Sequence, residues 1–198
     1  MTTQQRTVVA NISLSLDGRI TGPGGEYDMG WIVPHAISDG ARAHMVEVTS
    51  TATTALLGRK NYQGFGGFWP AVAGDPNADA ADRTFSRWLN DVDKVVFSTT
   101  LDQLDWDHAR LATAAPASTV KQLRQEDGGD IIVLASTSVI RQLLDAGEVD
   151  RLSITLCPEL VGGGERLFTD GPAATSWSLT STKATATGAL CQLYDRVR

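Results

Sequence analysis

The stretch Leu152-Ser-Ile-Thr-Leu-Cys-Pro-Glu-Leu-Val-Gly-Gly-Gly-Glu-Arg-Leu-Phe168 carries the strongest indication of fold in this chain. Its first residues alternate between hydrophobic and hydroxylated side chains, which predicts a β-strand that buries one face. A proline and three consecutive glycines then end the strand. Leu167 and Phe168 are expected to return to the core. The glycine run favours a bulge or a tight crossing of the chain over a phosphate loop, because it lacks the Gly-Lys-Ser/Thr ending.

Strand-like and helix-like segments alternate before this stretch, and a hairpin pattern follows it. Hydrophobic residues at even positions predict a first strand, and short apolar runs predict others, at 8–16, 54–57, 94–97 and 130–134. Helices are expected at about 38–50, 80–89, 118–126 and 138–147, with 66–79 as the longest irregular piece. Alternation around Gly188 predicts a terminal hairpin over 177–197. The order predicts an α/β fold, with a mostly parallel central sheet and an antiparallel C-terminal hairpin.

Composition narrows the class of protein. The chain has 198 residues, 42% of them hydrophobic and 20% charged, as expected for one globular domain over 1–198. The formal net charge of -6 argues against a general nucleic-acid surface, which needs a basic patch. Cys157 and Cys191 lie in apolar runs and are expected to be buried free thiols. The N-terminus is polar without an apolar region behind it, so we expect no signal peptide and a cytoplasmic protein.

Polar segments follow three of the predicted strands. In a parallel sheet these strand ends share one edge, which is where open α/β sheets bind ligands. A helix N-terminus after a strand also presents backbone N–H groups to an anion. Taken alone, each segment is explained at least as well by an ordinary turn or helix cap. Together they predict a nucleotide cradle formed by Gly58-Arg59-Lys60-Asn61-Tyr62, Ser98-Thr99-Thr100 and Ala135-Ser136-Thr137-Ser138.

Other chemistries find no support in the sequence. The three histidines are scattered and the two cysteines are far apart, so no zinc-ligand spacing occurs. No Gly-x-Ser-x-Gly elbow marks an α/β hydrolase. The G-x-G-x-x-G fingerprint does not follow the first strand, which argues against a standard Rossmann dehydrogenase.

Four segments in order resemble the dihydrofolate-reductase-like superfamily, specifically the C-terminal reductase domain of RibD-type riboflavin biosynthesis proteins. Ile12-Ser-Leu-Ser-Leu-Asp-Gly-Arg-Ile20 is similar to the family's first strand and turn, and Gly58-Arg-Lys-Asn-Tyr-Gln-Gly-Phe65 to its Gly-Arg-x-Thr-Tyr-Glu segment. Lys94-Val-Val-Phe-Ser-Thr-Thr-Leu101 resembles its Lys-x-Val-x-Ser strand, and 131–168 its closing region. The resemblance covers most of the chain and implies the family's three-layer fold.

The resemblance also implies bound NADPH. Carried over by position, Arg59 and Ser98, with Thr99, would hold the 2′-phosphate and adenosine end. The other cofactor-binding candidates are placed around the pyrophosphate (Gly58, Lys60, Asn61, Ala135, Ser136, Thr137 and Ser138) and beside the nicotinamide (Ala10 and Ile20). Ala135-Ser136 stands where the family has a glycine pair, and Asn61 replaces its usual threonine.

The substrate side is expected in the segment that contains Glu26, Tyr27, Asp28 and Trp31. Asp28 is the candidate for substrate contact and proton handling, and Trp31 for stacking on a flat heterocycle. The activity implied is reduction of 5-amino-6-(5-phosphoribosylamino)uracil or a related compound. The alternatives are a folate or pteridine reductase and a non-catalytic nucleotide-binding relative. A homodimer, with the terminal hairpin as a candidate interface, is a further implication of the resemblance.

Overall fold

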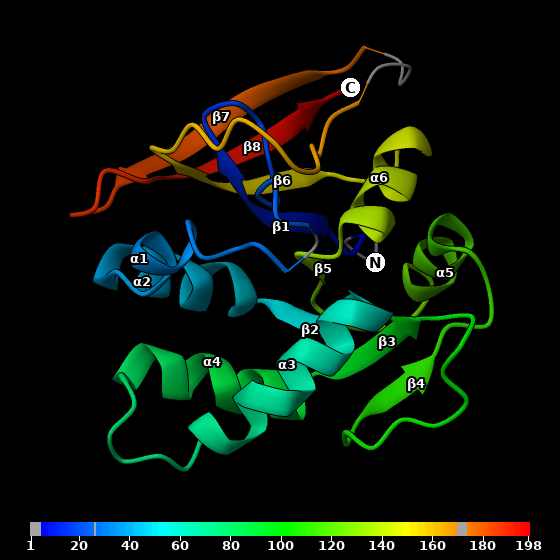
Figure 1. Cartoon of the computed structure of the whole chain (residues 1–198). Coiled ribbons are helices and arrows are strands. Elements are labelled where there is room, and N and C mark those ends of the chain that lie inside the picture. The colour runs from blue at the N-terminus through cyan, green and yellow to red at the C-terminus, as the bar shows by residue number, and fades with distance from the viewer. Residues whose placement is uncertain (1–4, 26, 170–173) are drawn as a thin grey trace.

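A single eight-stranded sheet forms the centre of the protein in a computed structural model that describes residues 5–25, 27–169 and 174–198. The strand order is β4-β3-β2-β5-β1-β6-β8-β7. Neighbours from β4 to β6 are parallel, whereas β8 runs antiparallel to both β6 and β7. The predicted mostly parallel sheet with an antiparallel C-terminal hairpin is therefore confirmed (Figure 1). The strands are β1 (Val8–Ser15), β2 (Ala52–Gly58), β3 (Asp93–Phe97), β4 (Ala109–Leu111), β5 (Asp130–Leu134), β6 (Arg151–Cys157), β7 (Ser176–Ala184) and β8 (Leu190–Val197).

Helices cover both faces of the sheet and complete three layers. Side chains of opposite parity along the strands enter separate cores, because successive residues of a strand point to opposite faces. Val9 and Leu57 pack with α2 (Asp39–Thr49), α3 (Arg59–Val72) and α4 (Ala80–Asp91). Val8 and Leu56 pack with α5 (Pro116–Leu123) and α6 (Thr137–Asp145) on the other face. A short helix, α1 (Val33–Ala36), precedes α2 (Figure 1).

Helix α3 extends through the first half of the segment 66–79 that the sequence assigned to an irregular loop. Gly66, Gly67 and Pro70 disfavour a helix locally, yet all three lie inside it. Tertiary packing overrides that preference, because Trp69 packs edge-on against Phe85 of α4 at 4.7 Å between ring centroids. The C-terminal carbonyls of α3 are also satisfied by α4 side chains, since Ser86 donates to the Trp69 carbonyl at 2.5 Å.

Smaller differences have similar causes. The helix expected to be capped by Ser118 begins at Pro116, because proline fits the first helical position, where no N–H is required. Phe168 does not return to the core. It remains 51% exposed, at the rim of a cavity that Trp177 also lines, while Leu167 is buried as expected. Strand β4 was not predicted.

Other details follow the sequence. Gly147 takes the left-handed conformation after α6, with φ of 71°, as expected for a helix C-cap. Cys157 and Cys191 are buried and free, and burial raises the pKa of the Cys157 thiol to about 11. In the described ranges, none of the helices has the length and hydropathy needed to cross a lipid bilayer. Neither do the described residues bring together three or more His, Cys, Asp or Glu side chains in a metal-binding arrangement.

Candidate functional site

The ends of β2 and β5 are tied together by one serine. Ser136 follows β5, and its Oγ accepts a hydrogen bond from the backbone N–H of Gly58, the last residue of β2, at 2.8 Å. The same hydroxyl donates to the Leu134 carbonyl at 3.0 Å. Ser136 is only 2% exposed. The segments that lead into α3 and α6 therefore lie side by side at the C-terminal ends of the parallel strands, as the parallel topology predicted.

The two helices that begin at this edge lack side-chain caps. The N-cap residues of α3 and α6 are Gly58 and Ser136, and neither makes a side-chain capping hydrogen bond. By contrast, Ser38 caps α2 and Asp79 caps α4 through their side chains. No side-chain oxygen thus caps the first turn of α3 or α6, although the Val139 N–H of α6 donates to the Ser136 carbonyl at 2.9 Å. Both helix dipoles favour a negative charge at these helix starts. This arrangement suits a phosphate or pyrophosphate group.

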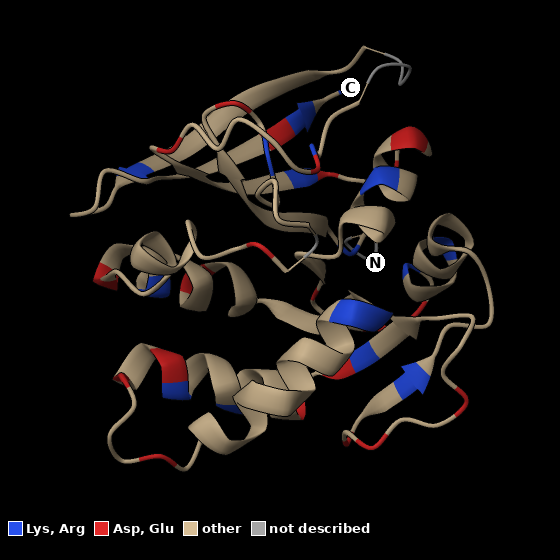
Figure 2. Ribbon diagram, viewed as in Figure 1, with Lys and Arg blue, Asp and Glu red and all other residues tan. Residues whose placement is uncertain are grey.

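Basic and hydroxyl side chains border the same edge. Arg59 begins α3, is exposed, and lies with Nη1 3.4 Å from Oγ1 of Thr100. Ser98 shapes the turn after β3, because its Oγ accepts hydrogen bonds from the backbone N–H groups of Thr100 at 3.1 Å and Leu101 at 3.0 Å. Thr99 is exposed beside it. Figure 2 shows the basic residues at the start of α3. The structure thus brings Arg59 to the Ser98–Thr100 turn, as the sequence analysis expected, with Thr100 as the residue in contact.

The other candidate cofactor-binding residues lie in the first turns of α3 and α6. Lys60 is exposed, and Asn61 is partly buried in the first turn of α3. Thr137 and Ser138 open α6, and a Cβ atom added to Gly58 would lie 3.8 Å from the Ser138 hydroxyl. The segment that follows β5 therefore presents the Ser136 and Ser138 hydroxyls to the space beside Gly58.

Ala135 adopts a backbone conformation that favours glycine. Its φ angle is 47°, in the left-handed region that costs a non-glycine residue about 1–2 kcal/mol. Its N–H donates to the Asn11 carbonyl of β1 at 2.9 Å, which fixes the turn. Ala135 thus holds a conformation that a glycine, the residue that the family resemblance implies here, would adopt without this cost.

Ala10 and Ile20 lie in the core rather than on an open surface. Ala10 is 0% exposed and Ile20 is 5% exposed, and both belong to the cluster packed under α5 and α6. A bound nicotinamide could touch their side chains only if this core opened. In this conformation the surrounding core therefore covers both side chains.

Asp28 is folded back onto the loop that precedes it. Its Oδ2 accepts a hydrogen bond from the Gly24 N–H at 3.0 Å, and its backbone carbonyl accepts one from the Gly22 N–H at 2.6 Å. A Cβ atom at Gly22 would overlap the Asp28 carboxylate. The Asp28 side chain therefore stabilises a turn in this conformation. Glu26, named with it in the sequence analysis, lies outside the described residues.

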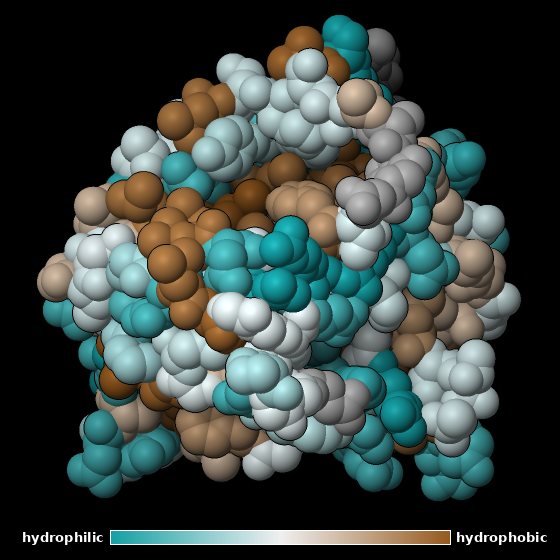
Figure 3. Space-filling model, turned by 45° about the horizontal axis from the view of Figure 1, so that its top comes forward, coloured by the Kyte–Doolittle hydropathy of each residue, from teal (hydrophilic) through white to brown (hydrophobic). Residues whose placement is uncertain are grey.

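Trp31 offers an unused hydrogen-bond donor. Its indole Nε1 is buried and has no hydrogen-bond partner among the described residues. Buried polar groups in proteins are nearly always paired, so this N–H is suited to an acceptor on a ligand or a water molecule. Exposed hydrophobic side chains are frequent in the surrounding segments and include Leu16, Tyr27, Met29, Val33, Ile37 and Leu160. Figure 3 shows hydrophobic residues gathered around a hollow near the middle of one face.

The loop after β6 is clamped onto the turn after β1. Asp17, which the sequence marked only as a turn residue, accepts hydrogen bonds from the Ser15 hydroxyl at 2.7 Å and from the backbone N–H groups of Val161 and Gly162. These bonds, the one from Ser15 first, hold the pKa of the Asp17 carboxyl far below its usual range. Gly164 crosses the chain so closely that a Cβ atom would overlap the Thr21 carbonyl oxygen. The predicted tight crossing is confirmed.

Comparisons with known proteins agree with this architecture. The family model described as the RibD C-terminal domain matches residues 6–191. YyaP, an uncharacterized protein of Bacillus subtilis (strain 168), is 24% identical over 191 residues, which cover 96% of this chain and 95% of YyaP.

Two solved structures share the fold at low sequence identity. A protein of Shewanella sp. PV-4, whose name suggests a role in riboflavin biosynthesis, has a TM-score of 0.70 and 18% identity, covering 97% of this chain and 99% of that one. Dihydrofolate reductase from Enterococcus faecalis, solved with NADP(H), has a TM-score of 0.62 and 16% identity, covering 98% of both chains. The dihydrofolate-reductase-like fold predicted from the sequence is confirmed.

Proposed function

Because the chain belongs to the RibD C-terminal domain family, we propose that it is an NADPH-dependent reductase. When bound, the nicotinamide would supply a hydride to a carbon of a heterocyclic or ribosylated substrate. The nearest named activity is reduction of 5-amino-6-(5-phosphoribosylamino)uracil, a step of riboflavin biosynthesis. The protein, acting as one domain over 1–198, would contribute binding, orientation and exclusion of water.

The observation that carries this proposal is the pair of uncapped helix starts that Ser136 ties together. Their first-turn N–H groups fit a pyrophosphate, with Lys60 and Asn61 on one side and Thr137 and Ser138 on the other. Arg59 and the turn of Ser98 and Thr99 fit the 2′-phosphate, because a guanidinium forms two parallel hydrogen bonds to such a group.

Trp31 and Asp28 are proposed on the substrate side. The buried, unpaired Nε1–H of Trp31 supports a hydrogen bond to a substrate acceptor. Asp28 could handle a proton only after its carboxylate leaves the Gly24 N–H, so we propose that role for a conformation with substrate bound.

The alternative of a folate or pteridine reductase is less well supported. Such enzymes use a carboxylate on the helix that α2 resembles. In α2 both Asp39 and Glu47 are exposed, and Glu47 pairs with Lys183 at 2.7 Å. The second alternative is a relative that binds nucleotides but is not an enzyme. Such a protein would bind NADPH but would not oxidise it in the presence of any pyrimidine or pteridine substrate.

Removing the Arg59 guanidinium should weaken NADPH binding about tenfold, which corresponds to about 1.4 kcal/mol, in a fluorescence titration of Arg59→Ala against the unchanged protein. NADH lacks the 2′-phosphate, so its affinity should change less than twofold. Lys121→Ala, which removes a 69% exposed cation on α5, serves as the matched charge control. Absence of NADPH binding by the unchanged protein at millimolar concentration would exclude the reductase function.

We also propose that the chain forms a homodimer through its terminal hairpin. Most residues of β7 are exposed, and Leu179 is 49% exposed at the edge of the sheet. Unpaired edge strands with apolar residues favour association. Leu179→Glu should raise the dimer dissociation constant at least tenfold in sedimentation equilibrium. Phe68→Glu replaces a 61% exposed aromatic residue of α3 and should leave the dimer dissociation constant unchanged. Equal dissociation constants for the two variants would contradict this interface.

A further inference from the structure

A cavity lies at the edge of the sheet opposite to the nucleotide cradle. Its volume is about 390 Å³, and it opens among Arg6 before β1, Thr53 and Thr54 near the start of β2, Asp93 at the start of β3 and the segment 126–128 before β5. The cradle, by contrast, follows the ends of β2 and β5. The volume lies within the range of small-molecule sites, about 300–1,000 Å³. A ligand held in this cavity would therefore bind apart from the proposed cofactor.

One wall of the cavity is a buried cation that has no carboxylate partner. Arg6 is 6% exposed. Its guanidinium donates only to neutral groups, which are the carbonyls of Gly129 and Leu123 and the hydroxyls of Thr53 and Thr54. Burial lowers the pKa of Arg6, but a guanidinium keeps its proton near pH 7. Since buried charges are usually paired, this positive charge favours an anionic group inside the cavity.

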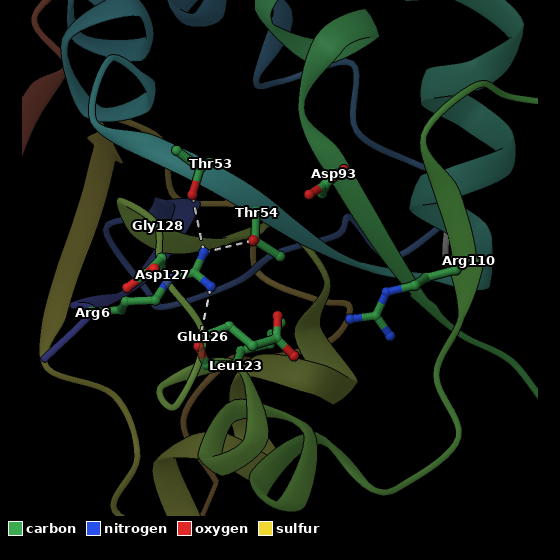
Figure 4. A pocket seen from close by; sticks show the side chains of 9 residues that line it. All are labelled: Arg6, Thr53, Thr54, Asp93, Arg110, Leu123, Glu126, Asp127 and Gly128. Carbon is green, nitrogen blue, oxygen red and sulfur yellow. Dashed lines mark hydrogen bonds between the residues drawn. The ribbon is translucent and has the colours of Figure 1, made fainter.

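The accessible part of the cavity carries both signs of charge. The exposed charged residues that line it are Asp93, Arg110, Glu126 and Asp127. Within the described ranges, the side chains of these four residues form no hydrogen bond or ion pair. Figure 4 shows the Arg6 and Arg110 guanidinium groups on opposite sides of the cavity, with the Asp93 and Glu126 carboxylates between them. The charged groups of the rim are thus available to a ligand.

The balance of charge narrows the kind of ligand. Two arginines and three carboxylates line the cavity, which leaves a net charge of -1. The carboxylates would repel a simple anion, and the two guanidinium groups would repel a simple cation. A molecule with one carboxylate and two cationic groups complements both signs and the net charge of the lining. Free amino acids with a basic side chain have this composition at neutral pH.

We propose that this cavity is a binding site for a free basic amino acid, separate from the nucleotide cradle. Arg110 holds the α-carboxylate, because a guanidinium forms two parallel hydrogen bonds to a carboxylate. The carboxylates of Asp93 and Glu126 accept hydrogen bonds from the two cationic groups of the ligand. The bound α-carboxylate also offsets the buried charge of Arg6. Binding at this site does not depend on the proposed reductase function.

Calorimetric titration of the full chain without NADPH tests this site. The probe is L-lysine, compared with L-norleucine, which lacks the side-chain ammonium, and with cadaverine, which lacks the carboxylate. Lysine should bind with a millimolar or lower Kd, at least tenfold more tightly than either analogue. Absence of lysine binding at millimolar concentration, or an analogue that binds as tightly as lysine, would overturn the proposal.

Two variants test the roles of the charged groups. Arg110→Met should weaken lysine binding at least tenfold without weakening cadaverine binding, because only lysine carries the carboxylate. Asp93→Asn should weaken the binding of both diamines. Arg87→Met and Asp102→Asn replace exposed residues outside the cavity and should change lysine affinity less than twofold. Equal lysine affinities in Arg110→Met and Arg87→Met would refute the site.

The proposed site and the proposed function can fail separately. NADPH affinity should stay within twofold in all four variants, because the cavity and the cradle lie at opposite edges of the sheet. A protein that binds lysine but not NADPH would keep this site and reject the reductase. A protein that binds NADPH but not lysine would do the reverse.

Discussion

Gly164→Ala is expected to lower the free energy of unfolding by about 3 kcal/mol, the upper end for a point mutation in a domain of this size. Gly164 has a φ angle of 89°, which an alanine adopts only at a cost. Its added Cβ would also overlap the Thr21 carbonyl oxygen, which belongs to the turn that follows β1. Since backbone cannot rotate aside as a side chain can, the two loops must separate. Urea denaturation followed by tryptophan fluorescence measures the change.

Gly162→Ala is the matched control for this crossing. Gly162 also has a positive φ angle, 75°, but open space surrounds the position of its Cβ. Only the conformational cost applies there, so we expect a loss of about 1 kcal/mol. The difference between the variants isolates the steric term. Equal losses would mean that the loops do not cross as closely as described.

The fold was largely predictable because its signals are local. Alternation along 8–16 and 152–156 identified two strands, and the strand-helix order identified a parallel sheet. The alternation predicted one buried face for the first strand, but β1 is buried on both faces because helices cover both sides of the sheet. Helix α3 escaped prediction because its support is not local. Gly66, Gly67 and Pro70 predict a break, whereas packing against distant segments, chiefly α4 later in the chain, holds them in a helix.

The candidate site divides in the same way. The parallel order of the strands sufficed to expect that Gly58 and Ser136 lie at one edge. The hydrogen bond between the Asn11 and Ser153 side chains could not be predicted, because the two residues are 142 positions apart and only the register of β1 and β6 brings them together. The burial of Ala10, by contrast, could be predicted from the local sequence. The alternation that identified β1 already put Ala10 on the hydrophobic side, and its burial follows from that pattern rather than from the resemblance.

Arg6 is the second position where a large effect is expected, because four hydrogen bonds depend on its guanidinium. Arg6 is 6% exposed, just before β1. It donates to the carbonyls of Gly129 at 2.7 Å and Leu123 at 3.1 Å, and to the hydroxyls of Thr53 at 3.0 Å and Thr54 at 2.7 Å. Figure 4 shows Thr53, Thr54 and Leu123 converging on it at the wall of a cavity of about 390 Å³. One side chain thus joins the starts of β1 and β2 to the end of α5.

Arg6→Met is therefore expected to lower the free energy of unfolding by about 3 kcal/mol, since each buried acceptor left unpaired costs about 1–3 kcal/mol and some regain water from the cavity. The stability of Arg6→Lys should lie between those of the unchanged protein and Arg6→Met, because one ammonium cannot reach all four acceptors. Arg110→Met is the control: Arg110 is exposed at the same cavity, and its loss should change stability by less than about 0.5 kcal/mol. An Arg6→Met protein as stable as Arg110→Met in urea would show that this junction is not held by the guanidinium.

NADPH affinity should stay the same in the folded Arg6→Met protein, because Arg6 lies at the starts of β1 and β2, whereas the nucleotide cradle follows the ends of β2 and β5.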